Sequence, residues 1–109
     1  MIITIRINKD LKSDFKSIKQ RTLSRFLSEI VNQFVTDYKS IKHNKNKVSA
    51  MCFELISFQD KDIKDAVLSV SIADEILSDL DKVCNELNMD KADVVRALIS
   101  KKVFMSDKC

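Results

Sequence analysis

The chain has 109 residues, of which 45% are hydrophobic and 32% charged, so it can form one domain with a modest core. It has no glycine and no proline, which excludes glycine-rich phosphate loops and dinucleotide-binding turns. His43 is the only histidine, and Cys52, Cys84 and Cys109 are far apart, so neither a catalytic triad nor a zinc site is expected. We therefore expect a protein that is not an enzyme and uses no cofactor or metal.

Hydrophobic patterning predicts a soluble, cytoplasmic protein with no membrane partner. The longest unbroken apolar stretch is Ala50–Phe53, far shorter than the roughly 20 residues that span a bilayer. The N-terminus lacks the charged-then-apolar layout of a secretion signal. An odd number of scattered cysteines also suits a reducing cytosol better than a disulfide framework.

Positive charge is concentrated in the first half of the chain. Residues 1–47 carry 11 Lys or Arg against 4 Asp or Glu, whereas residues 48–109 carry 8 against 12. A basic half joined to an acidic half is typical of a protein of which one end meets a polyanion, with nucleic acid the first candidate. The alternative is an ordinary lysine-rich surface exposed to solvent.

The first predicted element is a strand over residues 2–7, in which side chains of two kinds alternate. One face carries Ile3, Ile5 and Ile7, and the other carries Ile2, Thr4 and Arg6. The isoleucine face is expected to pack on the core. Hydrogen-bonding groups on the opposite face then point away from the core.

Two amphipathic helices are predicted after this strand. The first has Leu11, Phe15 and Ile18 on one face, with Asn8 or Asp10 as its cap. Thr22 caps the second, whose apolar residues recur with helical spacing. These residues are Leu23, Phe26, Leu27, Ile30, Val31, Phe34, Val35 and Tyr38.

Residues 39–65 form a connecting segment that is neither Gly-rich nor Ser-rich. Lys39–Lys47 is basic and is expected to be solvated or to follow a DNA backbone. Residues 50–58 are apolar: Met51, Phe53 and Leu55 alternate as in a strand, although Met51, Leu55 and Phe58 also fit a helix. We expect an extra strand or a packed segment, either filling the core or docking another protein.

The same order of elements then recurs. A strand over residues 67–72 places Leu68, Val70 and Ile72 inward and Val67, Ser69 and Ser71 outward. Its first helix has the stripe Ile76, Leu80, Val83 and Leu87, and the second has Val94, Val95, Leu98 and Ile99. Ala73 is a poor cap for the first of these helices, so Ser71 nearby is expected to serve instead. Asn88 is predicted to close the first helix in the left-handed conformation, and Asp90 to cap the second.

This duplication divides the chain into a first unit (residues 1–38), the connecting segment (39–65), a second unit (66–104) and a tail (105–109). Each unit resembles the ribbon-helix-helix (Arc/MetJ-type) DNA-binding unit, the second more closely, from Leu68 to Ile99. The resemblance implies a mostly α fold with a small antiparallel β-ribbon. One unit alone is too small to fold, so the two are expected to form a single-chain pseudo-dimer, with residues near Ile5 opposite residues near Val70. In layout the chain is similar to the TraY-type relaxosome accessory proteins of plasmid conjugation.

The resemblance also implies roles for residues at matching positions. The base-reading positions of the ribbon are Thr4, Arg6, Ser69 and Ser71. The phosphate-binding positions, at the start of the second helix of each unit, are Arg21, Thr22, Leu23, Ser24, Arg25 and Lys91. Asp90 departs from the Ser or Thr usual at its position, and its negative charge should repel a phosphate.

The expected function is sequence-specific binding of double-stranded DNA through a ribbon in the major groove, as a transcriptional repressor. One alternative is a relaxosome accessory protein that binds a plasmid transfer origin. Another is an antitoxin or protein-interaction module. Self-association, and a protein partner bound through residues 39–65, stay open at this point.

Overall fold

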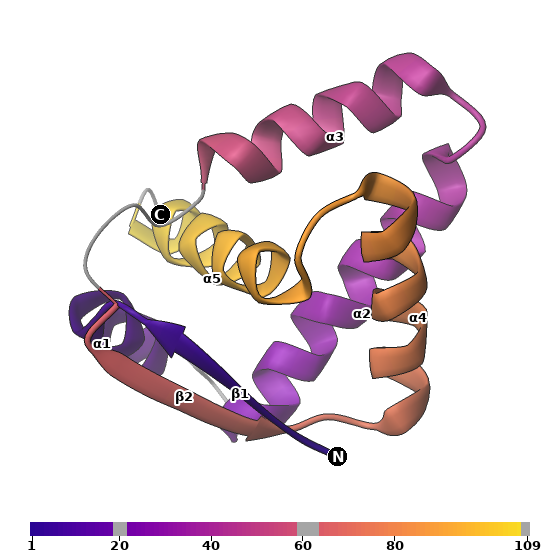
Figure 1. The fold of residues 1–109 in the computed structure, drawn as a ribbon. Coiled ribbons are helices and arrows are strands. Elements are labelled where there is room, and N and C mark those ends of the chain that lie inside the picture. The colour runs from indigo at the N-terminus through magenta and orange to yellow at the C-terminus, as the bar shows by residue number, and fades with distance from the viewer. Residues whose placement is uncertain (19–21, 59–63, 108–109) are drawn as a thin grey trace.

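The computed structural model describes residues 1–18, 22–58 and 64–107, and the chain is mostly helical there (Figure 1). Five helices and two strands follow one another in this part of the chain. They are β1 (Ile2–Ile7), α1 (Lys9–Ile18), α2 (Leu23–Ile41), α3 (Lys45–Ser57), β2 (Ala66–Ser71), α4 (Asp74–Leu87) and α5 (Lys91–Asp107).

The two strands pair with each other as an antiparallel sheet. Thr4 lies opposite Ser69, and Ile5 lies opposite Leu68. Residues near Ile5 therefore lie opposite residues near Val70, as expected, with Leu68 directly facing Ile5 and Ile3 facing Val70. The offset of two residues leaves the same side chains on each face of the sheet. Beyond the strand ends, the Ile72 backbone N–H donates to the Met1 carbonyl at 2.9 Å, which extends the ladder by one pair.

The predicted inward face of the sheet is the buried one. Ile5, Ile7, Leu68 and Val70 are all less than 10% exposed, whereas the residues between them are exposed. The hydrophobic side chains of the sheet and helices form one continuous core. The strands therefore follow the two-residue period read from the sequence, with one face on the core and one toward solvent.

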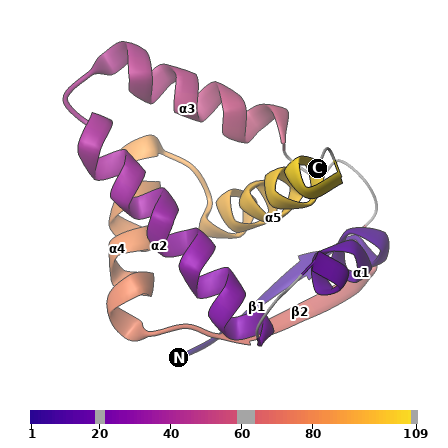
Figure 2. The same ribbon diagram turned by 180° about the vertical axis from the view of Figure 1, so that it is seen from behind.

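The helices pack across the two halves of the sequence. α1 lies against α5, and α2 lies against both α4 and α5. Phe15 of α1 stacks on Phe26 of α2, with ring centroids 5.1 Å apart. α3 packs only at the periphery, on α2 and α5, and Figures 1 and 2 place it on the side of the molecule opposite the strands.

Several helix ends follow the predicted capping chemistry. The Thr22 hydroxyl accepts from the Arg25 N–H at 3.3 Å, and the Asn8 side chain accepts from the Asp10 and Leu11 N–H groups. Asn88 has φ 57°, the left-handed conformation that a glycine would otherwise supply. Ala73 precedes α4 without a side-chain cap hydrogen bond, and the backbone N–H of nearby Ser71 bonds to the Ser24 hydroxyl.

The expected extra strand in residues 39–65 is wrong, because residues 45–57 form a helix. Asn44 caps it by accepting from the Asn46 and Lys47 N–H groups. Leu55 is buried, and its neighbours at helical spacing pack on the core, so the period of 3.6 residues prevails over the alternation. Two boundaries also move: α2 continues to Ile41 and α5 to Asp107.

Candidate nucleic-acid interface

The outward face of the two-stranded sheet is a row of three facing pairs. At its centre the Thr4 and Ser69 hydroxyl oxygens lie 3.2 Å apart, and either can donate. On one side of this pair Ile2 faces Ser71, and on the other Arg6 faces Val67. The predicted base-reading residues therefore lie together on one exposed surface, which we call the ribbon face.

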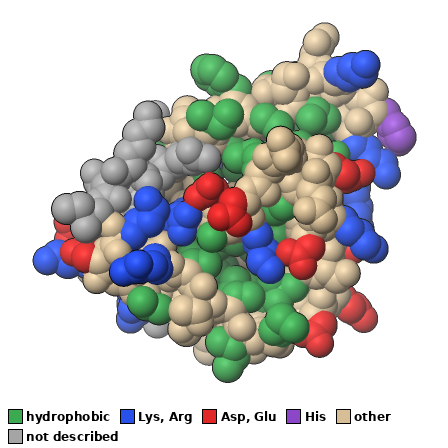
Figure 3. All heavy atoms as spheres, viewed as in Figure 1, with side chains coloured by type: hydrophobic (Ala, Val, Ile, Leu, Met, Phe, Trp, Pro, Cys, Tyr) green, Lys and Arg blue, Asp and Glu red, His purple; other side chains and the backbone are tan. Residues whose placement is uncertain are grey.

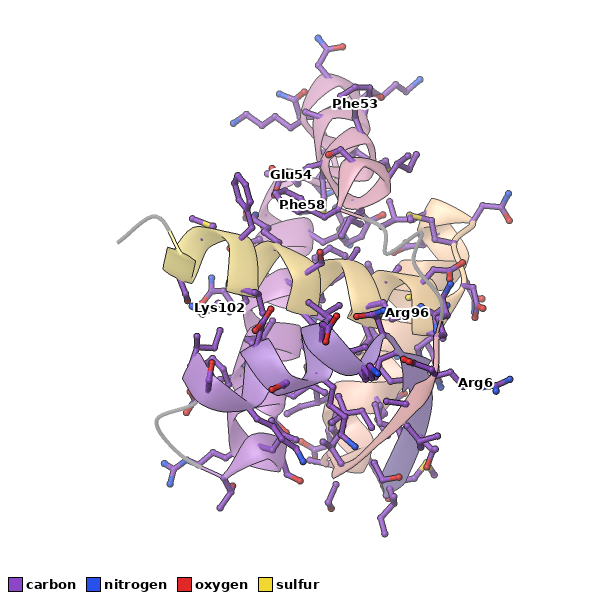
Figure 4. The ribbon with its side chains drawn as sticks, turned by 90° about the vertical axis from the view of Figure 1, so that its left-hand side faces the viewer. Arg6, Phe53, Glu54, Phe58, Arg96 and Lys102 are labelled. Atoms are coloured by element: carbon purple, nitrogen blue, oxygen red, sulfur yellow. The ribbon has the colours of Figure 1, made fainter. Side chains whose placement is uncertain are left out.

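Arg6 carries the only charge among these six side chains. It extends from β1 away from the helices into solvent (Figure 4). The backbone of Arg6 is fixed by α5, because the Arg96 guanidinium donates a hydrogen bond to the Arg6 carbonyl at 3.0 Å. Arg96 is itself paired with Asp93, and its side chain is only 12% exposed. The backbone of Arg6 is thus fixed while its own guanidinium faces outward.

The start of α2 lies at the end of β2. The Ser24 hydroxyl accepts from the Ser71 backbone N–H at 2.9 Å. Thr22 and Leu23 begin this helix beside that contact, and the first N–H groups of any helix lack partners within it. Such a helix start can bind a phosphate through Leu23 and Ser24 backbone N–H groups if DNA contacts the adjacent ribbon face.

Charged side chains near the two helix starts differ in their surroundings. The Arg25 side chain is exposed, and its Nε atom lies 3.7 Å from Oε1 of Glu29, one turn further along α2. Lys91, at the start of α5, is paired with Asp81 at 3.1 Å, with Asp90 beside it in the sequence. The α5 end therefore has less positive charge to offer a phosphate than the α2 end. Arg21, the remaining predicted phosphate ligand, lies outside the described residues.

The predicted role of Lys39–Lys47 as a trailing DNA contact is not supported by its position. This stretch is the end of α2, a turn and the start of α3, on the side opposite the ribbon face (Figure 1). Lys39 is paired there with Asp79 at 3.6 Å. Its basic residues are exposed to solvent, which is the other of the two expectations for this stretch.

Two residues that build the ribbon face were missed by the sequence interpretation. Lys12 of α1 donates from its ammonium group to the Val67 carbonyl at 2.6 Å, and Arg96 of α5 holds Arg6. Each ties a helix to a strand from the other half of the chain. Arg96 interrupts the otherwise apolar run of α5, which was an available signal, whereas Lys12 lies among other lysines and had none.

Surface charge is mixed on the face seen in Figure 3. Lys and Arg side chains are interspersed with Asp and Glu, and hydrophobic side chains are exposed between them. On the ribbon itself the exposed hydrophobic side chains are Ile2, 70% exposed, and Val67, 48% exposed. Apolar side chains of this size can contact the methyl group of thymine in a major groove.

The perturbed titratable groups lie in the core, away from the ribbon face. Burial raises the pKa of the Cys84 thiol to about 11, and nearby Asp81 adds to the effect. Burial also raises the pKa of Tyr38, with the Glu86 carboxylate contributing. Such a thiol stays protonated and unreactive at neutral pH.

Comparison of the chain with models of protein families, with curated proteins and with solved structures found no match. Within the described residues, none of the helices has the length and hydrophobicity needed to cross a membrane. In the same part of the chain, no group of three or more His, Cys, Asp or Glu side chains is placed to hold a metal ion.

Proposed function

We propose that the chain binds double-stranded DNA in a sequence-specific manner by inserting the ribbon face into the major groove. In this proposal the two halves are ribbon-helix-helix units that form a pseudo-dimer within one chain. A two-stranded antiparallel ribbon has the dimensions of the major groove, and its outward side chains then meet base edges.

The observation that carries the proposal is the register of the two strands. If Ile2 to Ile7 is matched to Val67 to Ile72, Thr4 is equivalent to Ser69 and Arg6 to Ser71. The pair Thr4–Ser69 then lies on a twofold axis, and the pairs on its two sides exchange with each other. A homodimeric ribbon has this symmetry by necessity, so finding it in one chain supports a fused dimer.

The packing of the helices supports the same twofold relation. If α1 is equivalent to α4 and α2 to α5, the twofold rotation converts the contact between α1 and α5 into a contact between α4 and α2. Both contacts are present. The second helix of each unit also contacts the ribbon at an equivalent position, although through non-equivalent side chains. The Ser24 hydroxyl of α2 accepts from the Ser71 N–H, and the Arg96 guanidinium of α5 donates to the carbonyl of Arg6, the residue equivalent to Ser71. α3 has no counterpart and is an insertion between the units.

We propose transcriptional repression as the consequence of binding, because occupation of a site by a compact ribbon protein blocks access to it. A relaxosome accessory role is the second candidate, and the pairing of both strands within one chain favours it, as in the tandem proteins that the chain resembles. The two roles use the same ribbon face and differ in where the bound site lies on a plasmid or chromosome.

Selection of bound sequences from random duplex DNA tests the proposal, followed by a salt titration on the selected site. We expect an enriched motif and an affinity that falls steeply with salt, since each neutralised phosphate contributes about −0.9 to the slope of log K against log salt. Recovery of no motif, together with binding that does not respond to salt, would refute DNA recognition by this face.

A further inference from the structure

The outward side of α3 is an exposed surface without charge. Its members share one side of the helix and are all exposed: Asn46, Ser49, Ala50, Phe53, Ile56 and Ser57. We call this set the α3 outer face. In a chain in which 32% of residues are charged, six neighbouring uncharged surface positions are unusual.

The centre of this surface is hydrophobic. Phe53 is 75% exposed, the largest value among the large hydrophobic side chains of the described residues, and Ile56 is 54% exposed. Phe53 lies on the side of α3 away from α5, whereas Phe58 is turned toward it (Figure 4). α3 thus has apolar side chains on two opposite sides, and only the side with Leu55 packs on the rest of the chain. A helix that is hydrophobic on both sides is normally covered on both.

The distribution of charge along α3 favours one kind of partner. Lys45 and Lys47 occupy its first turns, with no acidic residue there and no basic residue in the last turn. This arrangement is opposite to the one that suits a helix macrodipole, which is positive at the N-terminus and negative at the C-terminus. A second α3 running antiparallel corrects it, because the lysines of each helix then lie beside the C-terminal carbonyl groups of the other. Glu54 of each helix is already paired with Lys101 of its own α5, so the C-terminal end of the macrodipole, and not a free carboxylate, attracts these lysines.

We propose that the α3 outer face binds a second copy of this chain, with the two α3 helices antiparallel about a twofold axis. Around such an axis the residues at the centre of the helix meet their own counterparts, so a charge at the centre would face a like charge, whereas residues at one end of the helix meet the other end of the second helix. The α3 outer face contains none. The small side chains of Ser49 and Ala50 leave room for Phe53 of the second copy, so that the helices can approach closely.

The contact is small, and the dimer is correspondingly weak. α3 has 13 residues and is about 20 Å long, and a single helix pair of that length buries less than the roughly 1,600 Å² of a standard interface. We expect a dissociation constant of about 10–100 µM. Because α3 lies opposite the ribbon face, the dimer leaves both ribbons uncovered (Figure 2). The inference does not depend on DNA binding.

Sedimentation equilibrium of the free protein over about 10 µM to 1 mM tests it. We expect the mean mass to rise from the monomer value of 12.5 kDa toward twice that value. Phe53→Asp should keep the protein monomeric over the whole range without unfolding it, because Phe53 is largely exposed. Val67→Asp is the matched control, since it places the same charge on an exposed hydrophobic site of the ribbon, and it should leave the association unchanged.

A double variant, Lys45→Glu with Lys47→Glu, separates association from folding. It gives α3 the acidic start that its own macrodipole favours, so α3 should be no less stable. The same change should weaken the dimer by about tenfold or more, because the new carboxylates face the C-terminus of the second copy. A wild-type protein that stays monomeric up to about 1 mM, or equal weakening by Val67→Asp and Phe53→Asp, would overturn the proposal.

Discussion

Replacement of Arg6 by alanine tests the proposed ribbon face most directly. Arg6 is exposed and points away from the helices, and its backbone is held by Arg96 through a carbonyl that the substitution leaves in place. The folded state should therefore keep its stability within about 0.5 kcal/mol, as is usual for surface substitutions. For a domain of this size that corresponds to a shift in melting temperature of about 3 °C or less.

The effect on DNA binding should be larger and confined to particular sequences. A guanidinium that makes two hydrogen bonds to guanine O6 and N7 contributes about 1–3 kcal/mol of discrimination, so Arg6→Ala should weaken binding to the selected site by about 5-fold to 150-fold. Duplexes in which the contacted G·C pair is already changed should bind the wild type and the variant equally.

Fluorescence anisotropy with the selected duplex, and with duplexes in which each G·C pair is changed in turn, measures this pattern. Two variants serve as comparisons. Arg25→Ala, at the start of α2, should weaken all duplexes alike and reduce the salt slope by about 0.9. Lys82→Ala, in the half of α4 that runs away from the ribbon, removes the same charge and should change nothing. Uniform weakening by Arg6→Ala would show that Arg6 contacts phosphate only. Unfolding of that variant would show that its side chain belongs to the core.

Three further predictions follow from other parts of the molecule. Phe15→Ala removes a fully buried ring stacked on Phe26 and should lower the free energy of unfolding by about 3–5 kcal/mol, measured by urea denaturation. Ser71→Arg places a second guanidinium at the position equivalent to Arg6, so sequence selection should return a more palindromic site; an unchanged motif would argue against the twofold relation. Cys84 has a pKa of about 11 in the folded protein against 9.0 when unperturbed, so its contribution to stability is intact below pH 9 and is lost as the pH rises toward 11. In Cys84→Ala the fall in melting temperature over that pH range should therefore be smaller than in the wild type.

Much of the fold could be predicted because local signals agreed with one another. The alternation of Ile3, Ile5 and Ile7 identified the buried face, and Thr22 and Asn88 marked helix ends through chemistry that is complete within a few residues. The register was predicted only to within two residues. It depends on how the core closes around the sheet, since the strands are joined by a long helical connection rather than by a tight turn.

α3 could not be assigned from periodicity because it carries hydrophobic side chains on both sides. Phe53 completes an alternating pattern with Met51 and Leu55, although it is the exposed member of the three. The capping residue Asn44 is a sequence signal that favours the helix over the strand. In the candidate site the outward residues were predictable, whereas the hydrogen-bond partners of Lys12, Ser24 and Arg96 were not, because each bond joins segments at least 47 residues apart. Arg96 stands out in the sequence as a charge within an apolar run, but the run does not say which residue it contacts.

The proposed pseudo-dimer explains why the two halves of the molecule can differ in charge. In a homodimer each substitution appears twice, so both ends of the ribbon must offer DNA the same groups. In a single chain Arg6 can have Ser71 as its equivalent, and Thr22 at the start of α2 can have Asp90 at the start of α5. Phosphate binding is then favoured at the α2 end and opposed at the α5 end, where Lys91 is already paired with Asp81. A protein built in this way should bind one half of its site more tightly than the other, and so should fix its orientation on the DNA.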